Sequence, residues 1–295
     1  MDLNDPFIQQ RWRELQEMQL EDERAREEEA DLQAETAYLR LKLADSYARS
    51  GKVARAIAEY KRAIKLDKQN GLFHTRLADA YVMAEDIPTA MATYQKAINV
   101  DPLLADPHSS LGDLYLRYGM LMRAMEQYRE AVQLESERAF YRYQLGDLLD
   151  RVGMATEAMH ELTEAASLAP KIPFYRFRLA CMYQQQRKLE EAYTHMNHAC
   201  KLAPYDDYFL VRLAGLAAAT RRDKEAVIVL EKAFALRPRN DAYQRLLAEA
   251  FLRVDRHDLY EYHCRRVGRM NAYDEEFVTR RLAEWQIQSI SPSYS

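Results

Sequence analysis

The sequence repeats itself every 34 residues, and this period restricts the fold more than any other feature of the chain. In each of seven copies a Leu is followed at once by Ala or Gly, and no copy is separated from the next by an insertion. The seven leucines are Leu43, Leu77, Leu111, Leu145, Leu179, Leu213 and Leu247. A period of roughly 20 to 50 residues is the signature of repeat architectures, in which every copy is one supersecondary unit. We therefore expect seven stacked copies of a small unit.

Each copy has the pattern of two amphipathic helices. An Ala recurs near the start of the expected second helix and again seven residues later, as Ala56 and Ala63 do in the first copy. Residues at this spacing lie on nearly the same helix face, and small side chains there let two helices approach closely. Four copies then end in a Pro that stops the second helix, namely Pro102, Pro170, Pro204 and Pro238. With only 8 Gly and 9 Pro in 295 residues, the composition also favours an all-α chain over a turn-rich β fold.

This spacing of small residues, aromatic residues and Pro resembles the tetratricopeptide repeat (TPR) family over about residues 37–274. The resemblance implies a right-handed superhelix, an α-solenoid of helix-turn-helix repeats. The first helix of each repeat would line a concave groove and the second would form the convex back. The seven repeats are expected at 37–70, 71–104, 105–138, 139–172, 173–206, 207–240 and 241–273. In the last copy Tyr260, Cys264 and Val267 depart from the pattern, so we expect this repeat to be splayed or capped.

The segment before the repeats, residues 1–36, has a different composition. It holds 12 acidic residues and four Arg, a net charge of −8, whereas the whole chain has a net charge of −4. We expect an acidic helical extension, and three interpretations stay open. It is a solvated helix that leads into the first repeat, an acidic segment folded back over the groove, or a helix that packs on a partner or a second copy. The last interpretation would use the apolar residues Phe7, Ile8, Trp12 and Leu15.

The segment after the repeats also has an apolar stripe. Residues 274–288 place Phe277, Leu282 and Trp285 at helical spacing, which predicts a capping helix over the last repeat. A docking helix for a partner is the alternative. Residues 289–295 are polar and are expected to be a disordered tail.

One position of the first helix carries an Asp in each of the first four copies. These residues, which we call the Asp ladder, are Asp45, Asp79, Asp113 and Asp147, and three of them have an Arg four residues later: Arg49, Arg117 and Arg151. In the TPR family, ligand contacts come from such fixed positions on the first helix. The ladder is either neutralised by its own Arg residues or available to accept hydrogen bonds from the backbone and basic side chains of a ligand.

The fourth to sixth copies place aromatic residues at positions that the same resemblance assigns to the groove. They are Phe140, Tyr143, Phe174, Phe177 and Tyr208, which we call the aromatic row. Clustered exposed aromatic side chains favour a binding patch, whereas cover by neighbouring helices would make them part of the core.

No pattern in the chain indicates catalysis or a cofactor. No phosphate-binding GxxxxGK or GxGxxG loop occurs, and the His and Cys residues match no zinc-site spacing. We therefore expect no enzyme, no cofactor and no metal. The balance of 42 basic and 46 acidic residues, together with the Asp ladder, argues against nucleic-acid binding.

The sequence also predicts no membrane insertion, because no apolar run approaches the ~18 residues that a spanning helix needs. The first residues lack the features of a signal peptide, and the three Cys show no CxxC spacing, so a cytoplasmic location is expected.

Together these features predict a non-catalytic scaffold or assembly factor. It would bind an extended or helical protein segment with basic and apolar residues in the groove. The alternative is a structural subunit of a larger complex or a homo-oligomer, held through the terminal helices.

Overall fold

The computed structural model describes residues 6–266, with the backbone alone at 6–17, 19–20, 22–23, 25–27, 30 and 264–266. These residues form fourteen α-helices and no strand, which confirms the all-α prediction of paired helices. Residues up to Ser136 belong to one compact unit and residues from Glu137 to another, here called unit 1 and unit 2. The expected capping helix at 274–288, with Trp285, and the tail at 289–295 lie outside the described residues.

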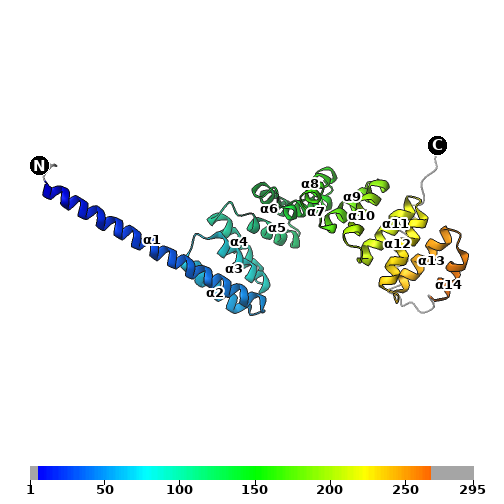
Figure 1. Cartoon of the computed structure of the whole chain (residues 1–295), viewed down its shortest axis with the longest axis horizontal. Coiled ribbons are helices and arrows are strands. Elements are labelled where there is room, and N and C mark those ends of the chain that lie inside the picture. Colours follow the sequence, from blue (N-terminus) through cyan, green and yellow to red (C-terminus); the bar gives the residue numbers. More distant parts are fainter. Residues whose placement is uncertain (1–5, 267–295) are drawn as a thin grey trace. The chain divides into compact units, whose positions relative to one another are not determined.

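Unit 1 contains six helices in which each packs against the next in the chain. They are α1 (Pro6–Arg49), α2 (Val53–Leu66), α3 (Gly71–Met83), α4 (Ile87–Val100), α5 (Ala105–Arg117) and α6 (Leu121–Leu134). Helix α1 is 44 residues long, so the acidic extension and the first helix of the first copy form one uninterrupted helix. Only its last part packs against α2, and the preceding part extends beyond the other helices of unit 1 (Figure 1).

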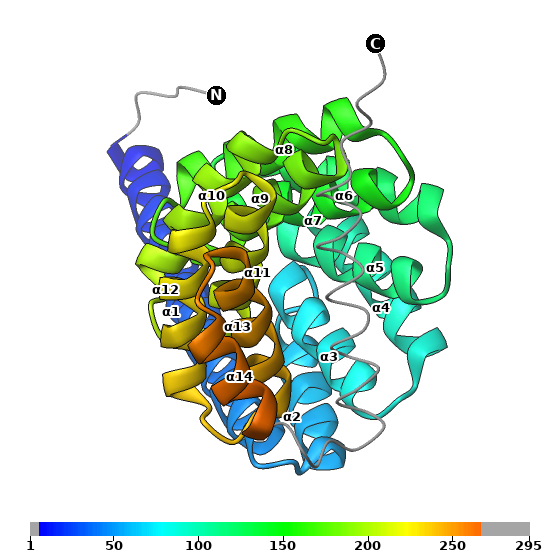
Figure 2. The same ribbon diagram turned by 90° about the vertical axis from the view of Figure 1, so that its right-hand side faces the viewer.

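Unit 2 continues the same alternation of helices. It contains α7 (Ala139–Arg151), α8 (Ala155–Leu168), α9 (Pro173–Gln185), α10 (Leu189–Leu202), α11 (Asp207–Ala219), α12 (Asp223–Leu236), α13 (Asp241–Arg253) and α14 (His257–Arg266). Within this unit α7, α9 and α11 lie along one side, and their partners α8, α10 and α12 lie along the other (Figure 2). The first helices of successive copies therefore present one shared face.

A small residue after each motif Leu allows the two helices of a copy to approach closely. At Gly112 a Cβ atom would lie 2.6 Å from the Tyr128 Cε1 atom of the paired helix, closer than real Cβ contacts. The Ala residues at the same position in the other copies, such as Ala78 and Ala180, are fully buried. The small residue after each motif Leu thus indicates that the two helices of a copy pack closely.

The turn between the two helices of a copy has the same backbone shape throughout. Its central residue has a positive φ in every copy, from 57° at Asp255 to 84° at Gly153. In the third copy the Gly119 N–H donates to the Leu116 carbonyl and the Met120 N–H donates to the Tyr115 carbonyl, which is the Schellman pattern of helix ends. Three copies use Gly at this position, and four use Glu85, Arg187, Arg221 and Asp255.

Within residues 6–266, no helix combines the length and the apolar character needed to cross a membrane. The long helix α1 fails this criterion because of its charged residues.

Candidate protein-binding surfaces

In unit 1 the Asp ladder is bound to Tyr residues of the second helices. The Tyr60 hydroxyl donates to Asp45 Oδ1 at 2.6 Å, and the Tyr94 hydroxyl donates to Asp79 Oδ1 at 2.5 Å. In the third copy Tyr128 donates to Asp113 Oδ1, also at 2.5 Å. Each Tyr lies 15 residues after its Asp, so the same bond joins α1 to α2, α3 to α4 and α5 to α6. One oxygen of each carboxylate therefore holds the two helices of its own copy together.

The fourth member of the ladder, Asp147 in unit 2, has different partners. Leu162 occupies the position of the Tyr and packs against Gly146. The carboxylate of Asp147 pairs instead with Arg151 of its own helix, Nε to Oδ2 at 2.9 Å, and with Arg178 of α9. Arg178 also reaches Asp150 Oδ2 at 3.4 Å. Asp147 thus connects the fourth copy to the fifth through Arg178.

Burial affects the charge of the ladder in the second copy. Desolvation raises the pKa of Asp79 above its ordinary value, although the Tyr94 hydroxyl and Arg76 oppose this effect by stabilising the carboxylate. The Arg76 guanidinium lies 3.5 Å from Asp79 Oδ2. Burial likewise raises the pKa of Tyr94, so this phenol remains a proton donor at neutral pH.

The three Arg residues expected beside the ladder differ in their surroundings. Arg151 forms the expected ion pair with Asp147 while its side chain stays 58% exposed. Arg49 and Arg117 lie exposed at the ends of α1 and α5. Exposed cations of this kind contribute little to stability but remain available to a ligand.

The aromatic row forms a continuous series of ring contacts across three helices of unit 2. From α7 to α9, the ring centroids of Tyr143 and Phe174 are 5.3 Å apart, edge to face. From α9 to α11, those of Phe177 and Tyr208 are 5.7 Å apart, also edge to face. Phe140, at one end of the row, lies 6.5 Å from Tyr143. The structure thus brings together all five aromatic residues that the sequence singled out.

The members of the row differ in exposure. Phe140, Phe174 and Tyr208 are 46%, 39% and 45% exposed, whereas Phe177 is buried and Tyr143 is intermediate. Phe177 stacks on Phe209 of α11 with their centroids 5.1 Å apart. Phe177 and Tyr143 therefore support the row from beneath, and the other three rings form its surface.

Two Arg residues of the helices that carry the row, Arg178 of α9 and Arg212 of α11, have protein partners. Arg178 is held by Asp147 and Asp150, and the Arg212 guanidinium donates to Gln184 Oε1 at 2.7 Å. These two cations are therefore bound within the protein, and the exposed members of the row itself are aromatic.

The sequence interpretation missed the residues that bind the ladder. Tyr60, Tyr94 and Tyr128 recur at the 34-residue period, 15 residues after the Asp, and this column was visible in the repeat alignment. Arg178 and Arg212 form a second periodic signal, because each contacts residues 28 and 31 positions earlier, in the preceding copy.

The apolar residues expected to dock at the two ends cannot be placed as side chains. Trp12 and Leu15 belong to helix α1, but their side chains, like that of Trp285, lie outside the described residues. Their role in docking remains a prediction.

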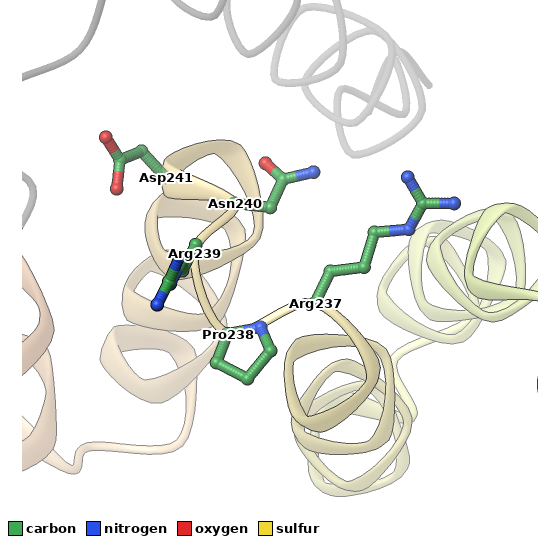
Figure 3. A pocket seen from close by; sticks show the side chains of 5 residues that line it. All are labelled: Arg237, Pro238, Arg239, Asn240 and Asp241. Carbon is green, nitrogen blue, oxygen red and sulfur yellow. The ribbon is translucent and has the colours of Figure 1, made fainter.

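One open hollow of about 550 Å³ lies at the turn between α12 and α13 (Figure 3). Its lining is the consecutive stretch 237–241, in which the side chains of Arg237 and Asp241 point away from one another. Arg237 Nε binds Asp207 Oδ2 at 2.8 Å, and the Asn240 side chain accepts the Ala242 N–H. Polar groups do not converge here, as a small-molecule site would require.

The two described thiols, Cys181 and Cys200, are held in their protonated form by burial. Burial raises the pKa of Cys200 to about 12 and also raises that of Cys181, so both thiols are protonated at neutral pH. In the part of the chain that the structure describes, no group of three or more His, Cys, Asp or Glu could hold a metal ion. No catalytic domain is identified.

Two family models match parts of the chain. A model described as TPR repeat matches residues 44–84 and 78–119, and one described as tetratricopeptide repeat matches residues 175–206. No curated protein matches the sequence.

Several solved structures have a similar fold. YrrB, described as a TPR protein with an unusual peptide-binding site, is 20% identical, with a TM-score of 0.52 over 61% of this chain and 93% of its own. PilF of Pseudomonas aeruginosa is 19% identical, with a TM-score of 0.56 over 72% of this chain and 98% of its own. A chain of the Cut9–Hcn1 hetero-tetramer of APC/C is 18% identical, with a TM-score of 0.54 over 72% of this chain and 42% of its own.

Proposed function

Since this chain is a tetratricopeptide repeat protein, we propose that it is a non-catalytic scaffold or assembly factor that binds a segment of another protein. The segment is extended or helical and carries apolar and basic side chains. It binds to the face formed by the first helices of the copies, which the TPR resemblance assigns to a concave groove.

The aromatic row is the observation that carries this proposal. Three exposed rings, Phe140, Phe174 and Tyr208, lie on successive first helices and contact one another through Tyr143 and Phe177. Rigid aromatic side chains lose little conformational entropy on binding and commonly dominate interface energies. The row therefore suits the apolar side chains of a partner.

The Asp ladder supports the basic component of the same partner. The Tyr hydroxyls bind Oδ1 of Asp45 and Asp79, and carboxylates have further lone pairs that can accept hydrogen bonds. A Lys or Arg side chain or a backbone N–H of the partner would bind there. The Tyr bonds fix the carboxylates in place before the partner arrives, which reduces the entropy lost on binding.

Selection from a displayed library of random peptides tests this proposal with the full chain as bait. We expect the selected peptides to combine apolar residues with Lys or Arg. The double variant Phe174→Ala/Tyr208→Ala should weaken their binding about tenfold or more, measured by isothermal titration calorimetry. The triple variant Asp45→Asn/Asp79→Asn/Asp113→Asn keeps an acceptor for each Tyr and should reduce the preference for basic residues.

Tyr205→Ala is the matched control, because this ring is 82% exposed in the turn before α11 and is not one of the five residues of the row. Binding equal to wild type is expected for it. Failure to select any peptide, or equal affinity for the wild type and the double variant, would contradict the proposal. Circular dichroism confirms that each variant keeps its helical content.

A further inference from the structure

The first copy has a stacking face that no other part of the described chain covers. In the six later copies the residues at the two stacking positions equivalent to Leu39 and Leu43 are buried, for example Phe73 and Leu77 at 3% and 7% exposure. Leu39 and Leu43 themselves are 58% and 43% exposed. Within each unit the second helix of one copy packs against the first helix of the next, whereas the first copy is preceded by the acidic extension and not by a repeat.

The exposed face continues along the part of α1 that extends beyond unit 1. Leu32 and Met18 are 65% and 59% exposed, and Met18, Leu32 and Leu39 are separated by multiples of seven residues. Leu43 lies four residues after Leu39 and completes the spacing of a heptad repeat. The sequence register places Ala25 in the same series. This stripe lies opposite the α2-facing side of α1, where Leu41 and Ala44 are buried.

The charged residues on one side of this stripe are complementary to those on the other side in a second copy of the helix. With Met18, Leu32 and Leu39 at heptad position d, the g positions from 14 to 35 hold Glu14, Glu21, Glu28 and Glu35, and the e positions from 19 to 40 hold Gln19, Arg26, Gln33 and Arg40. In a parallel pair of helices, each g position faces the e position of the next heptad of the other chain. Every facing pair then joins Glu to Gln or Arg. An antiparallel pair would oppose Glu to Glu.

We infer that the partner of this face is a second copy of the chain, bound through α1 in a parallel, in-register, two-stranded coiled coil over residues 18–43. Arg40 donates to Glu59 of α2 at 3.0 Å and keeps a side chain that is 39% exposed, so it can also face Glu35 of the second copy. Residues 22 and 29, which are Asp and Glu, occupy a positions and weaken the seam by like-charge repulsion.

Sedimentation equilibrium of the full chain at about 50 μM tests the inference, and we expect the mass of two chains. Leu32→Asp/Leu39→Asp should yield the mass of one chain. Glu29→Leu replaces a repelling layer with an apolar one and should lower the dissociation constant about tenfold or more. Tyr38→Asp is the control: Tyr38 is 51% exposed but lies off the stripe, so the dimer should persist.

Disulfide crosslinking tests the orientation. Leu32→Cys should form a disulfide-linked dimer under mild oxidation, because equivalent d residues meet in a parallel, in-register pair. Asp31→Cys, one residue off the seam, should remain uncrosslinked. A single-chain mass for the wild type, a dimer that survives Leu32→Asp/Leu39→Asp, or equal crosslinking of both Cys variants would overturn the inference.

Discussion

The Asp ladder continues from unit 1 into unit 2, but its structural role changes between them. In unit 1 the carboxylates of Asp45, Asp79 and Asp113 accept a Tyr hydroxyl from the second helix of the same copy. In unit 2 Asp147 binds Arg178 of the following copy. The residue 15 positions after the Asp is Tyr in unit 1 and Leu162 in unit 2, and the residue 31 positions after Asp147 is Arg178. A repeat can thus keep its fold while side-chain changes replace a bond within a copy by a bond between copies.

The largest effect is expected where the bond joins two copies. Asp147→Ala leaves the partly buried Arg178 with only Asp150 as a partner, and breaking such a pair should lower the free energy of unfolding by about 3 kcal/mol. Urea unfolding followed by circular dichroism measures this change. Arg151→Ala, which removes the more exposed partner of the same carboxylate, is the control and should cost well under half as much. Equal decreases in the free energy of unfolding for the two variants would mean that the bond between Asp147 and Arg178 does not contribute more than the bond to Arg151.

A smaller effect is expected from the bond within a copy. Tyr94→Phe removes the donor to Asp79 and should cost about 1.5 kcal/mol, since a half-buried carboxylate loses one charged hydrogen bond. The same unfolding experiment, extended to Asp79→Asn and to the double variant, gives the coupling energy between the two residues. Additive effects in this cycle would show that the bond does not contribute to stability.

The intra-copy turns provide a third comparison of the units. Three of the four turns in unit 2 carry a residue other than Gly at the positive-φ position, namely Arg187, Arg221 and Asp255, whereas two of three turns in unit 1 use Gly. Arg187→Gly should relieve backbone strain and raise the free energy of unfolding by up to about 1 kcal/mol, and Gly119→Ala should lower it by a similar amount. A Cβ at Gly119 would meet no atom within 4 Å, so the loss would come from the backbone alone. Thermal unfolding of both variants measures the two shifts, and shifts of the same sign would contradict the explanation.

The smallest effect concerns the pH dependence of unit 1. Burial raises the pKa of Asp79 in the folded state above its unfolded value of 3.8. At a pH between the unfolded-state and folded-state pKa values of Asp79, the folded chain holds a proton that the unfolded chain has released. The contribution of this group to stability therefore falls as the pH rises through that range. Asp79→Asn should flatten this dependence above about pH 4 while keeping an acceptor for Tyr94. Parallel stability curves for wild type and variant between acid and neutral pH would contradict the assignment.

The sequence predicted the repeat phase and the paired helices because both follow from one-dimensional spacing. The aromatic row could also be grouped in advance, because positions such as Phe140 and Phe174 differ by exactly one period. The division of the row into surface and support could not, because the burial of Phe177 depends on side chains of another helix, such as Phe209. The partners of the ladder were missed for a similar reason: i,i+4 reasoning considers one helix, whereas Tyr60, Tyr94 and Arg178 reach across to another.

The absence of a break between the acidic extension and the first copy has a mechanical consequence. Residues 6 to 36 of α1 rise about 45 Å along the helix axis, at about 1.5 Å per residue. An uninterrupted helix of this length sets both the distance and the rotational position of a group attached near Pro6 relative to the first copy. Inserting one residue in this stretch would turn the attachment point by about 100°, whereas inserting seven would lengthen the helix by about 10 Å and nearly restore its phase.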